Sequence, residues 1–312
     1  MGRVGLVVIA HGTVDSLDEL PTFLTNIRRG HAPSAELLHE VTRRYEAIGG
    51  QSPLNAITRE VAEKLSRATG LPAQACGRLF SPYPKDVVKE LAALGVEEFV
   101  VVPLAQHSAP LYVQAVREAV TELVPNGRTR GPENWGREPA LLQLFASRVD
   151  AALANVPDDE LATTTVVWSA HSLPTAVVRA GDPYDAEAHA AAAALEPMVK
   201  RKPGRFVLSY QSQGMSSGPG GRPIEWMGPD LHTVMKAQKA AGQTRVLVAP
   251  VGFLADHVEI LYDLDIEALG WAEALSLGFS RTASLNADDA FVRALMNVIT
   301  PFLAPEASPG AP

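Results

Sequence analysis

Short apolar runs rich in β-branched residues alternate with helical patterns along this chain. The strand-like runs are 3–10, 73–78, 97–103, 163–170, 205–210 and 244–250. Amphipathic helical patterns cover roughly 34–46, 54–69, 84–94, 110–124, 138–155, 185–200, 229–241, 256–268 and 287–303. Strands that are apolar along their whole length are buried on both faces, as in a parallel sheet covered by helices. The pattern therefore predicts an α/β fold.

Two segments in the first half of the chain resemble two segments in the second half, in the same order. "VVIAHG" (7–12) and "VVWSAHS" (166–172) both end an apolar strand in Ala-His. "GVEEFVVVPLAQHSAPLYV" (95–113) and "GQTRVLVAPVGFLADHVEI" (242–260) share a glycine, a charged turn, a strand, a proline and a helix start. Unless this likeness is chance between two βα units, it predicts two similar lobes, 1–155 and 156–303, followed by a disordered tail at 304–312.

Composition excludes several function classes. A net charge of −8 argues against nucleic acid, whose phosphates require a basic surface. The single Cys76 excludes an intrachain disulfide or a cysteine-held iron–sulfur cluster within one chain. The first apolar run is too short to span a membrane and no export cleavage pattern follows it. We expect a soluble cytoplasmic protein without an integral membrane segment.

A histidine follows the apolar strand of the second repeat. In "WSAHSLP" (168–174), His171 stands where the chain leaves the predicted sheet. Ligands of open α/β sheets bind beyond the carboxyl ends of the strands. His171 is therefore a candidate site residue, although a histidine there could also cap the next turn.

Three acidic residues lie four apart in "DHVEILYDLDIEALG" (256–270). Glu259, Asp263 and Glu267 would form one stripe on a helix. Such a stripe could be a solvated face, and Asp256 with Glu259 resembles a capping box. It could equally give a divalent cation a series of oxygen ligands beside His171.

Several ordered blocks resemble the ferrochelatases, which insert ferrous iron into a porphyrin. They are "NIRRG" (26–30), "RYEAIGGQSPLNAIT" (44–58), "SAHSLP" (169–174), "GDPY" (181–184), "SYQS" (209–212), "WMGPD" (226–230) and "PVGFLADHVEILYDLDIE" (250–267). The resemblance covers essentially the whole chain. It implies two Rossmann-like lobes with parallel four-stranded sheets flanked by helices, and a porphyrin cleft between them.

The resemblance also implies roles for particular residues of the second repeat. His171 matches the histidine of the porphyrin cleft and Glu259 the carboxylate facing it, so both are expected to be catalytic and to contact the metal. Asp263 and Glu267 match acidic metal positions leading outward from that carboxylate. Trp226 matches a tryptophan that packs against the macrocycle.

Further expected site residues lie in the first lobe. Ser52 matches a polar residue on the propionate side of the cleft. Arg44 matches a residue beside the outer end of the acidic series. Ile27, Arg28 and Arg29 belong to a block that resembles the branch using coproporphyrin III. Adjacent arginines suit the four propionates of that ring, although they could also be a solvated helix end.

The chain departs from the family pattern in the first repeat. His11 stands where coproporphyrin enzymes often have a tyrosine that approaches the metal, and it could bind iron or have no ligand at all. Leu79 and Phe80 replace polar residues at the edge of the cleft. Because Cys76 is the single cysteine, we expect no iron–sulfur cluster and no cofactor beyond the substrate Fe²⁺.

The insertion of iron into a porphyrin requires chemistry that these residues can perform. Two pyrrole protons must leave as iron enters, which requires a base near the ring centre, and a ring held distorted exposes its nitrogen lone pairs. Whether His171 or Glu259 takes the proton stays open. We therefore predict a monomeric lyase of haem biosynthesis that binds porphyrin and ferrous iron, with transient contact to the next haem-pathway enzyme.

Three other functions remain open. They are a protoporphyrin IX ferrochelatase, a cobalt or nickel chelatase for a sirohydrochlorin-type ring, and a tetrapyrrole carrier without catalysis. The acidic series argues against a carrier, because a ring that already holds its metal needs no path for a cation.

Overall fold

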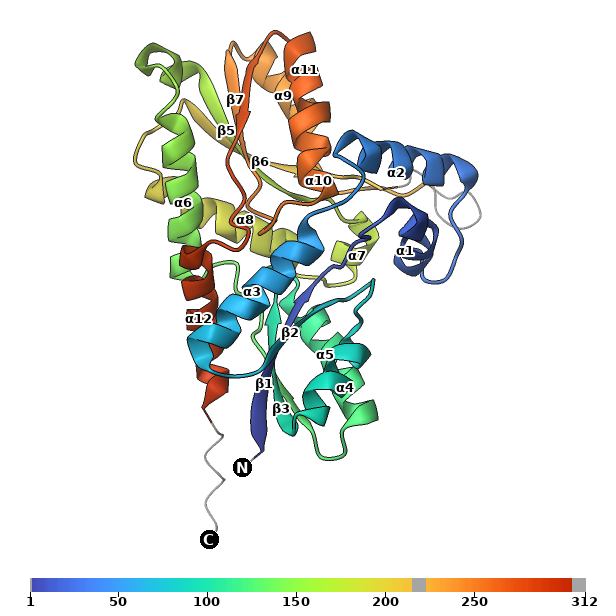
Figure 1. The fold of residues 1–312 in the computed structure, drawn as a ribbon. Coiled ribbons are helices and arrows are strands. Elements are labelled where there is room, and N and C mark those ends of the chain that lie inside the picture. Colours follow the sequence, from blue (N-terminus) through green and yellow to red (C-terminus); the bar gives the residue numbers. More distant parts are fainter. Residues whose placement is uncertain (1, 215–222, 305–312) are drawn as a thin grey trace. The chain divides into compact units, whose positions relative to one another are not determined.

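A computed structural model describes residues 2–214 and 223–304, and within them the strands form two parallel four-stranded sheets (Figure 1). The strand bounds are β1 Arg3–Ala10, β2 Ala73–Gly77, β3 Val96–Pro103, β4 Arg128–Arg130, β5 Thr164–His171, β6 Arg205–Gln211, β7 Arg245–Ala249 and β8 Gly278–Arg281. The orders are β2-β1-β3-β4 and β6-β5-β7-β8. The identical order in both sheets confirms the predicted fold of two parallel sheets flanked by helices.

Helices connect the strands and flank both sheets. Their bounds are α1 Leu20–Ile27, α2 Ala35–Ala47, α3 Leu54–Thr69, α4 Pro84–Ala93, α5 Ala109–Leu123, α6 Pro139–Leu153, α7 Thr175–Arg179, α8 Tyr184–Leu195, α9 Leu231–Ala240, α10 Val258–Leu261, α11 Leu269–Ala274 and α12 Asp289–Leu303. A π-helix, Asp263–Ala268, lies between α10 and α11. Short 3₁₀ turns occupy Leu17–Glu19, Asp158–Thr163 and Glu196–Met198.

The chain packs as two units. The first comprises Met1–Trp135 and Asn286–Pro312, and the second Gly136–Leu285. Helix α6 packs against α8 and β7 of the second unit, whereas α12 returns to pack on β3 and α3 of the first. The expected lobe boundary at 155/156 and the porphyrin cleft stay predictions.

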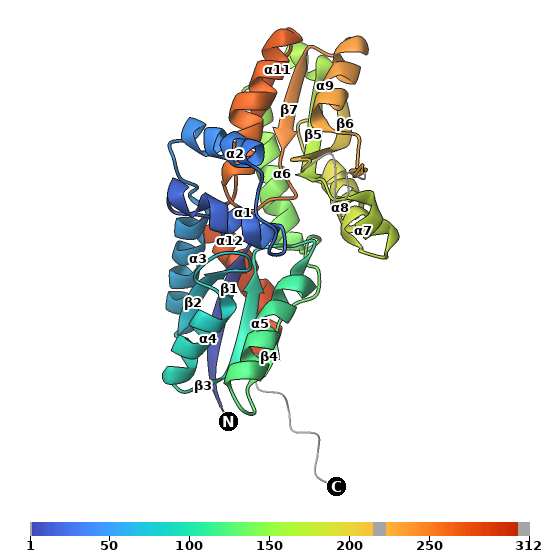
Figure 2. The same cartoon turned by 90° about the vertical axis from the view of Figure 1, so that its right-hand side faces the viewer.

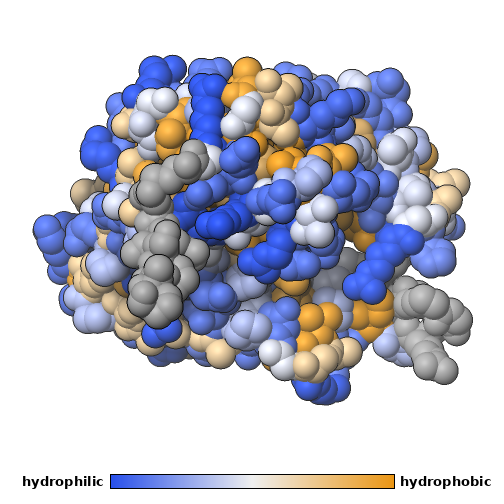
Figure 3. Space-filling model, turned by 90° about the horizontal axis from the view of Figure 1, so that it is seen from below, coloured by the Kyte–Doolittle hydropathy of each residue, from blue (hydrophilic) through white to orange (hydrophobic). Residues whose placement is uncertain are grey.

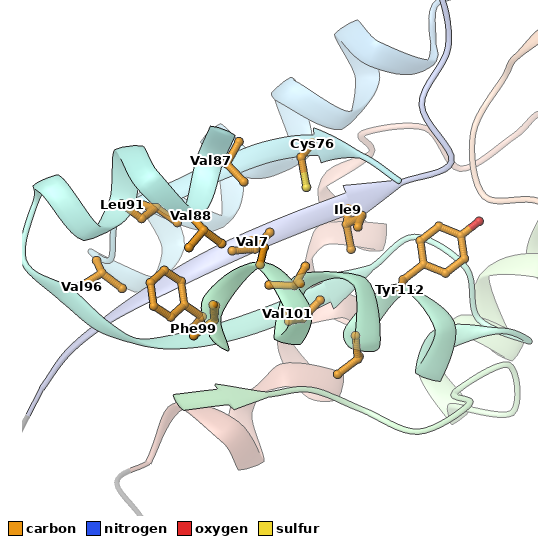
Figure 4. Close-up of a cluster of buried hydrophobic side chains, with 14 residues drawn as sticks. Val7, Ile9, Cys76, Val87, Val88, Leu91, Val96, Phe99, Val101 and Tyr112 are labelled. Atoms are coloured by element: carbon orange, nitrogen blue, oxygen red, sulfur yellow. The ribbon is translucent and has the colours of Figure 1, made fainter. Parts of the chain in front are cut away.

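The sheet of the first unit is buried on both faces. Successive side chains of β1 alternate between the faces, yet Leu6, Val7, Val8 and Ile9 all have no exposed surface. Helices α4 and α5 cover one face, where Val7 and Ile9 pack with Phe99 (Figure 4). Helices α3 and α12 pack against the strands from the other face (Figure 2). This double burial is why β1 is apolar throughout.

The second sheet has the same arrangement around β5. Val167 packs with Val246 of β7, Met235 of α9 and Ile260 of α10 on one face. On the other face, Ala170 packs with residues of α8 and β6. Because side chains alternate, His171 points to the same face as Val167, the face that α10 covers.

The strand and helix predictions were confirmed in most places. The short strands β4 and β8 were missed, as were α1, α7 and α11. The single helix expected over 256–268 is wrong, because α10 ends at Leu261 and the π-helix follows. The loop expected over 212–225 lies outside the described residues at 215–222, as does the predicted disordered tail at 305–312.

In the described ranges 2–214 and 223–304, no helix is long and apolar enough to cross a membrane. Figure 3 shows one face of the molecule, where hydrophilic colours predominate and hydrophobic ones occur in small scattered groups. Scattered apolar residues of this kind are usual on a protein surface.

Candidate active site

His171 is the last residue of β5, at the carboxyl end of the second sheet. Its backbone N–H donates to the Tyr184 hydroxyl at 3.1 Å. Its ring Nδ1 lies against the Ser172 carbonyl oxygen, so we assign the Nδ1 proton to that contact. In this tautomer Nε2 carries the lone pair of the neutral ring. The imidazole is therefore held by its neighbours with Nε2 directed away from the backbone.

Glu259 lies opposite His171 because the loop after β7 approaches β5 closely. The Gly252 N–H donates to the Ser169 carbonyl at 2.9 Å. A Cβ on Gly252 would lie 2.6 Å from Cα of Ala170, so only glycine fits here without a backbone shift. The Gln211 amide of β6 donates to the Glu259 carbonyl at 2.8 Å and fixes the start of α10.

The Glu259 carboxylate lies between two imidazoles. Oε1 is 3.4 Å from Nε2 of His171, and Oε2 is 3.5 Å from Nε2 of His257. The His257 Nδ1 faces the Ala255 carbonyl at 3.1 Å, which directs Nε2 toward the carboxylate. The Phe253 ring lies near both imidazoles, with ring centroids 6.3 Å from His171 and 5.1 Å from His257.

The ion pair shifts both groups toward their charged forms. Burial alone would lower the pKa of His171, but the charge of Glu259 and its hydrogen bond outweigh burial and raise it. Burial would raise the pKa of Glu259, but His171 and then His257 hold it well below its usual value. Both shifts stabilise the charged forms of the two groups, an imidazolium beside a carboxylate, relative to their neutral forms.

Asp263 begins the π-helix and is 5% exposed. It accepts a hydrogen bond from the Ser212 hydroxyl at 2.5 Å, and its charge contributes to raising the pKa of His171. Glu267 lies in the same π-helix and is partly exposed. A π-helix has a wider turn than an α-helix and occurs frequently at functional sites.

The expected metal ligands do not form a closed metal site. Across residues 2–214 and 223–304, no group of three or more His, Cys, Asp or Glu side chains is arranged to hold a metal ion. His171 and Glu259 form a close pair, and Asp263 and Glu267 follow along the π-helix.

The capping-box interpretation of Glu259 is wrong. His257, not Asp256, is the residue that caps α10, and it makes no side-chain capping bond. The Glu259 carboxylate contacts the two imidazoles instead. Asp256 accepts from the Ser284 hydroxyl at 2.7 Å and so contacts a different part of the unit.

His11 has an equivalent place in the first unit, directly after β1. It is exposed, and its Nδ1 lies 3.5 Å from the Tyr112 hydroxyl. The Phe23 ring packs edge-on against it with centroids 6.4 Å apart, and Phe80 packs edge-on against Phe23. The guanidinium of Arg78 lies 5.6 Å from the centre of the Tyr112 ring.

The other candidate residues of the first unit lie at or after α1. Ile27 ends that helix and is 41% exposed. Arg28 donates from Nε to the His31 carbonyl at 3.2 Å, and Arg29 is exposed with a positive φ of 56°. Ser52 is buried, and its hydroxyl accepts from the Leu54 N–H at 3.4 Å.

Arg44 and Trp226 are partly buried in different units. Arg44 on α2 is bonded through Nε to Glu40 at 2.8 Å. Trp226 forms an isolated bridge with Pro174, and its ring lies over Gly214, where a Cβ would come within 2.8 Å of it. Trp226 therefore lies beside the segment that follows His171.

Sequence reasoning missed His257, Gln211 and Ser212, all of which contact Glu259 or Asp263. His257 is two residues from Glu259, a spacing that on a helix would turn the side chains apart. It reaches the carboxylate because its backbone is extended, with φ −159°. Gln211 and Ser212 lie in the "SYQS" block, whose position beside His171 depended on the strand pairing.

A family model described as Ferrochelatase matches residues 3–302. The chain belongs to the ferrochelatase family. The Ferrochelatase of Herpetosiphon aurantiacus is 34% identical over 308 residues, covering 96% of this chain and 98% of that protein. The Coproporphyrin III ferrochelatase of Anoxybacillus flavithermus is 32% identical over 318 residues, covering 97% of each chain.

Solved structures with lower identity share the ferrochelatase fold of this chain. SirB from Bacillus subtilis with Fe³⁺ has a TM-score of 0.59 at 11% identity, covering 97% of this chain and 96% of its own. The sirohydrochlorin chelatase SirB from Bacillus subtilis subspecies spizizenii in complex with cobalt has a TM-score of 0.55 at 12% identity, covering 96% and 94%. These likenesses concern the fold alone.

Family membership confirms the resemblance seen in the sequence and the predicted enzyme class. This ferrochelatase is a lyase that inserts a metal ion into a porphyrin, so iron and porphyrin are its substrates. The non-catalytic carrier is thereby disfavoured.

Proposed function

We propose that this ferrochelatase inserts Fe²⁺ into coproporphyrin III to give coproheme, with release of two protons. The observation that carries the proposal is the pair formed by His171 and Glu259 at the carboxyl end of β5, with Nε2 and Oε1 3.4 Å apart. A base and a metal-binding oxygen within one contact distance can act on the same ring centre.

His171 is the better proton acceptor of the pair. In the neutral form of the ring, with the Nδ1 proton facing a carbonyl oxygen, the Nε2 lone pair can receive a pyrrole proton. The resulting imidazolium is stabilised by the Glu259 carboxylate, which raises the pKa of His171. Glu259 remains ionised throughout, since its pKa is held low, and offers oxygen to the incoming iron.

Asp263 and Glu267 extend the oxygen ligands along the π-helix. Fe²⁺ must exchange its hydration shell for protein ligands before it reaches the ring, and carboxylates spaced along one element allow a stepwise exchange. Asp263 is already oriented by the Ser212 hydroxyl. Glu267 is more accessible to solvent and would meet the cation first.

Two observations support coproporphyrin III over protoporphyrin IX. Several relatives at 32% identity are named coproporphyrin III ferrochelatase, including those of Anoxybacillus flavithermus and Bacillus cereus. Coproporphyrin III carries four propionates, and Arg28 and Arg29 present two cations beside the exposed Ile27 at the end of α1. Ser52, His11 and Trp226 complete the set of proposed ring-binding residues.

The decisive experiment is an anaerobic assay of Fe²⁺ insertion into each porphyrin, followed by the absorbance change of the ring. We expect kcat/KM for coproporphyrin III to exceed that for protoporphyrin IX by about tenfold or more, as two lost carboxylate contacts predict. Equal values would overturn the ring choice. Tight binding of both free rings without turnover would overturn the catalytic proposal and favour a carrier.

The proposal requires no resident cofactor. With one cysteine in the whole chain, buried in β2, a cluster needing several thiolates has no ligand set here. A lone thiol also suits the reducing cytoplasm, where we place the enzyme. A monomeric state and transient contact with the next haem-pathway enzyme stay predictions.

A further inference from the structure

We propose that Arg281 is a positioning residue that holds Glu259 and Asp263 in place by binding Asp256, in the loop before α10, and Asp265, in the π-helix. Arg281 is the last residue of β8 and is not among the residues expected to touch substrate. The inference rests on the proposed metal role of Glu259, Asp263 and Glu267.

Arg281 binds the π-helix through a bidentate contact with Asp265, which we call the Arg281 fork. Arg281 donates from Nε to Oδ1 of Asp265 at 2.5 Å and from Nη2 to Oδ2 at 2.7 Å. Two parallel charge-assisted bonds fix the carboxylate in orientation as well as in distance. The pKa of Arg281 is raised, chiefly by its hydrogen bond to Asp265. Asp265 is therefore held firmly to the edge of the sheet.

The same guanidinium also reaches the loop before α10. Its Nη1 lies 3.5 Å from Oδ1 of Asp256 and donates to the Thr282 carbonyl at 3.1 Å. Asp256 is further fixed by the Ser284 hydroxyl at 2.7 Å. The Arg281 side chain is 16% exposed, so these contacts are shielded from most solvent. One side chain thus joins two points on either side of Glu259 and Asp263.

The side chains of Asp263 and Asp265 leave the π-helix on opposite sides and are bonded to different segments. Residues two apart point to nearly opposite sides of a helix, and Asp263 accepts from Ser212 while Asp265 accepts from Arg281. π-helical turns are uncommon and short, and in this one the two acidic side chains are each bonded to a neighbouring strand or its continuation. Loss of the Arg281 fork would let the acidic residues shift relative to His171 without removing any of them.

Arg245 provides a matched control in the same unit. It begins β7, is paired with β8 at Gly278, and donates from Nε and Nη2 to Glu160 at 3.0 and 2.9 Å. Its side chain is 25% exposed. It lines the same cavity of about 350 Å³ as Arg281. Both Arg245 bonds reach the same oxygen, Oε2 of Glu160, and Glu160 is not part of the metal-handling segment. Arg245 is therefore a partly buried arginine bonded to a carboxylate but not connected to that segment.

The test compares Arg281→Lys with Arg245→Lys. Lysine keeps the charge but cannot bind a carboxylate at two points. We expect Arg281→Lys to raise KM for Fe²⁺ by about tenfold, the lower end of the range for losing a residue that orients metal ligands. Its kcat and its porphyrin dissociation constant should stay within about twofold of wild type. Arg245→Lys should leave all three parameters unchanged.

A double-mutant cycle separates positioning from general damage. Arg281→Met and Asp265→Asn should each raise KM for Fe²⁺, and the double variant should be no worse than Arg281→Met alone. Additive effects, or equal KM for Arg281→Lys and wild type, would overturn the inference. Thermal melts of every variant check folding, and an Arg281→Met that fails to fold leaves Arg281→Lys as the deciding variant.

Glu259→Gln distinguishes this inference from the proposed function. If Glu259→Gln retains full turnover, the metal role itself is wrong. If Glu259→Gln is inactive while Arg281→Lys has an unchanged KM for Fe²⁺, only the positioning role of Arg281 is wrong.

Discussion

Nε2 of His171 lies 3.4 Å from Oε1 of Glu259, although the two residues belong to segments far apart in sequence. Strands β5 and β7 are adjacent and parallel, with Trp168 opposite Ala249. Their carboxyl ends therefore meet at one edge of the sheet, where β5 ends in the histidine and the chain after β7 leads to the glutamate. The pair is a direct product of strand order.

Replacing the histidine tests its role as proton acceptor. We expect His171→Ala to lower kcat by about 10²- to 10⁴-fold, the range typical of removing a general base. Binding of porphyrin, measured by fluorescence quenching, should persist. His189→Ala, which removes an exposed histidine of α8, serves as the control and should keep normal turnover. A kcat for His171→Ala within a few-fold of wild type would contradict the assignment.

The acidic series should show a gradient of effects. Glu259→Gln should abolish or severely reduce iron insertion, because it removes the oxygen anion nearest His171. Asp263→Asn and Glu267→Gln should mainly raise KM for Fe²⁺, since outer ligands affect delivery more than insertion. Steady-state assays over a range of Fe²⁺, with thermal melts alongside, measure the gradient. Equal effects at all three positions would count against it.

Arg28 and Arg29 should determine which of the two porphyrins binds more tightly. Arg28→Ala/Arg29→Ala should weaken binding of coproporphyrin III by more than it weakens binding of protoporphyrin IX, because the first ring has two additional propionates to lose. Fluorescence titration of both rings provides the comparison. Arg59→Ala/Arg67→Ala, a pair of exposed arginines on α3, is the control. Equal weakening of both rings would identify Arg28 and Arg29 as solvated residues.

A helix cap gives a pH-dependent contribution to stability away from the site. Asp230 caps α9 and accepts from the Thr233 N–H at 2.9 Å and from its hydroxyl at 2.6 Å. Burial would raise the pKa of Asp230, but these bonds outweigh it and lower the pKa. Asp230→Ala should therefore reduce the free energy of unfolding by about 1 kcal/mol at neutral pH.

This contribution should depend on pH in a defined direction. Because the folded-state pKa is the lower one, the stabilisation is present above the unfolded-state value of roughly 4 and is lost as the pH falls through the folded-state pKa. Urea unfolding at several pH values measures the difference between wild type and Asp230→Ala. Asp230→Asn, which caps without titrating, is the control. A difference that stays constant down to pH 2 would refute the expectation.

The sheets could be predicted from the sequence because the burial of both faces is evident from the residues of an individual strand. β1 and β5 are apolar on both faces, and this identifies a covered parallel sheet without any knowledge of pairing. Strands β4 and β8 lie at the sheet edges and are short and polar, as in "RTR" at 128–130. They gave no such pattern and were missed.

The site could be predicted only in part. His171 and Glu259 were identified from their place after apolar strands and from family blocks. The π-helix was not, because the four-residue spacing of Glu259, Asp263 and Glu267 keeps side chains on one face in either kind of helix. The contact of His257 with Glu259 depends on an extended residue before α10, a local geometry that no periodicity reveals.

Helix α12 has a consequence for how the chain is made. Phe291 and Leu295 of this helix are buried, and Lys64 of α3 donates to the Ala287 carbonyl at 2.7 Å and to Asp289 at 2.8 Å. During synthesis, β1 and β3 leave the ribosome long before α12 does. The part of the first sheet that α12 covers, at β3, must therefore wait, uncovered and exposed to aggregation, while the whole second unit is translated. The amino-terminal sheet is begun first and finished last.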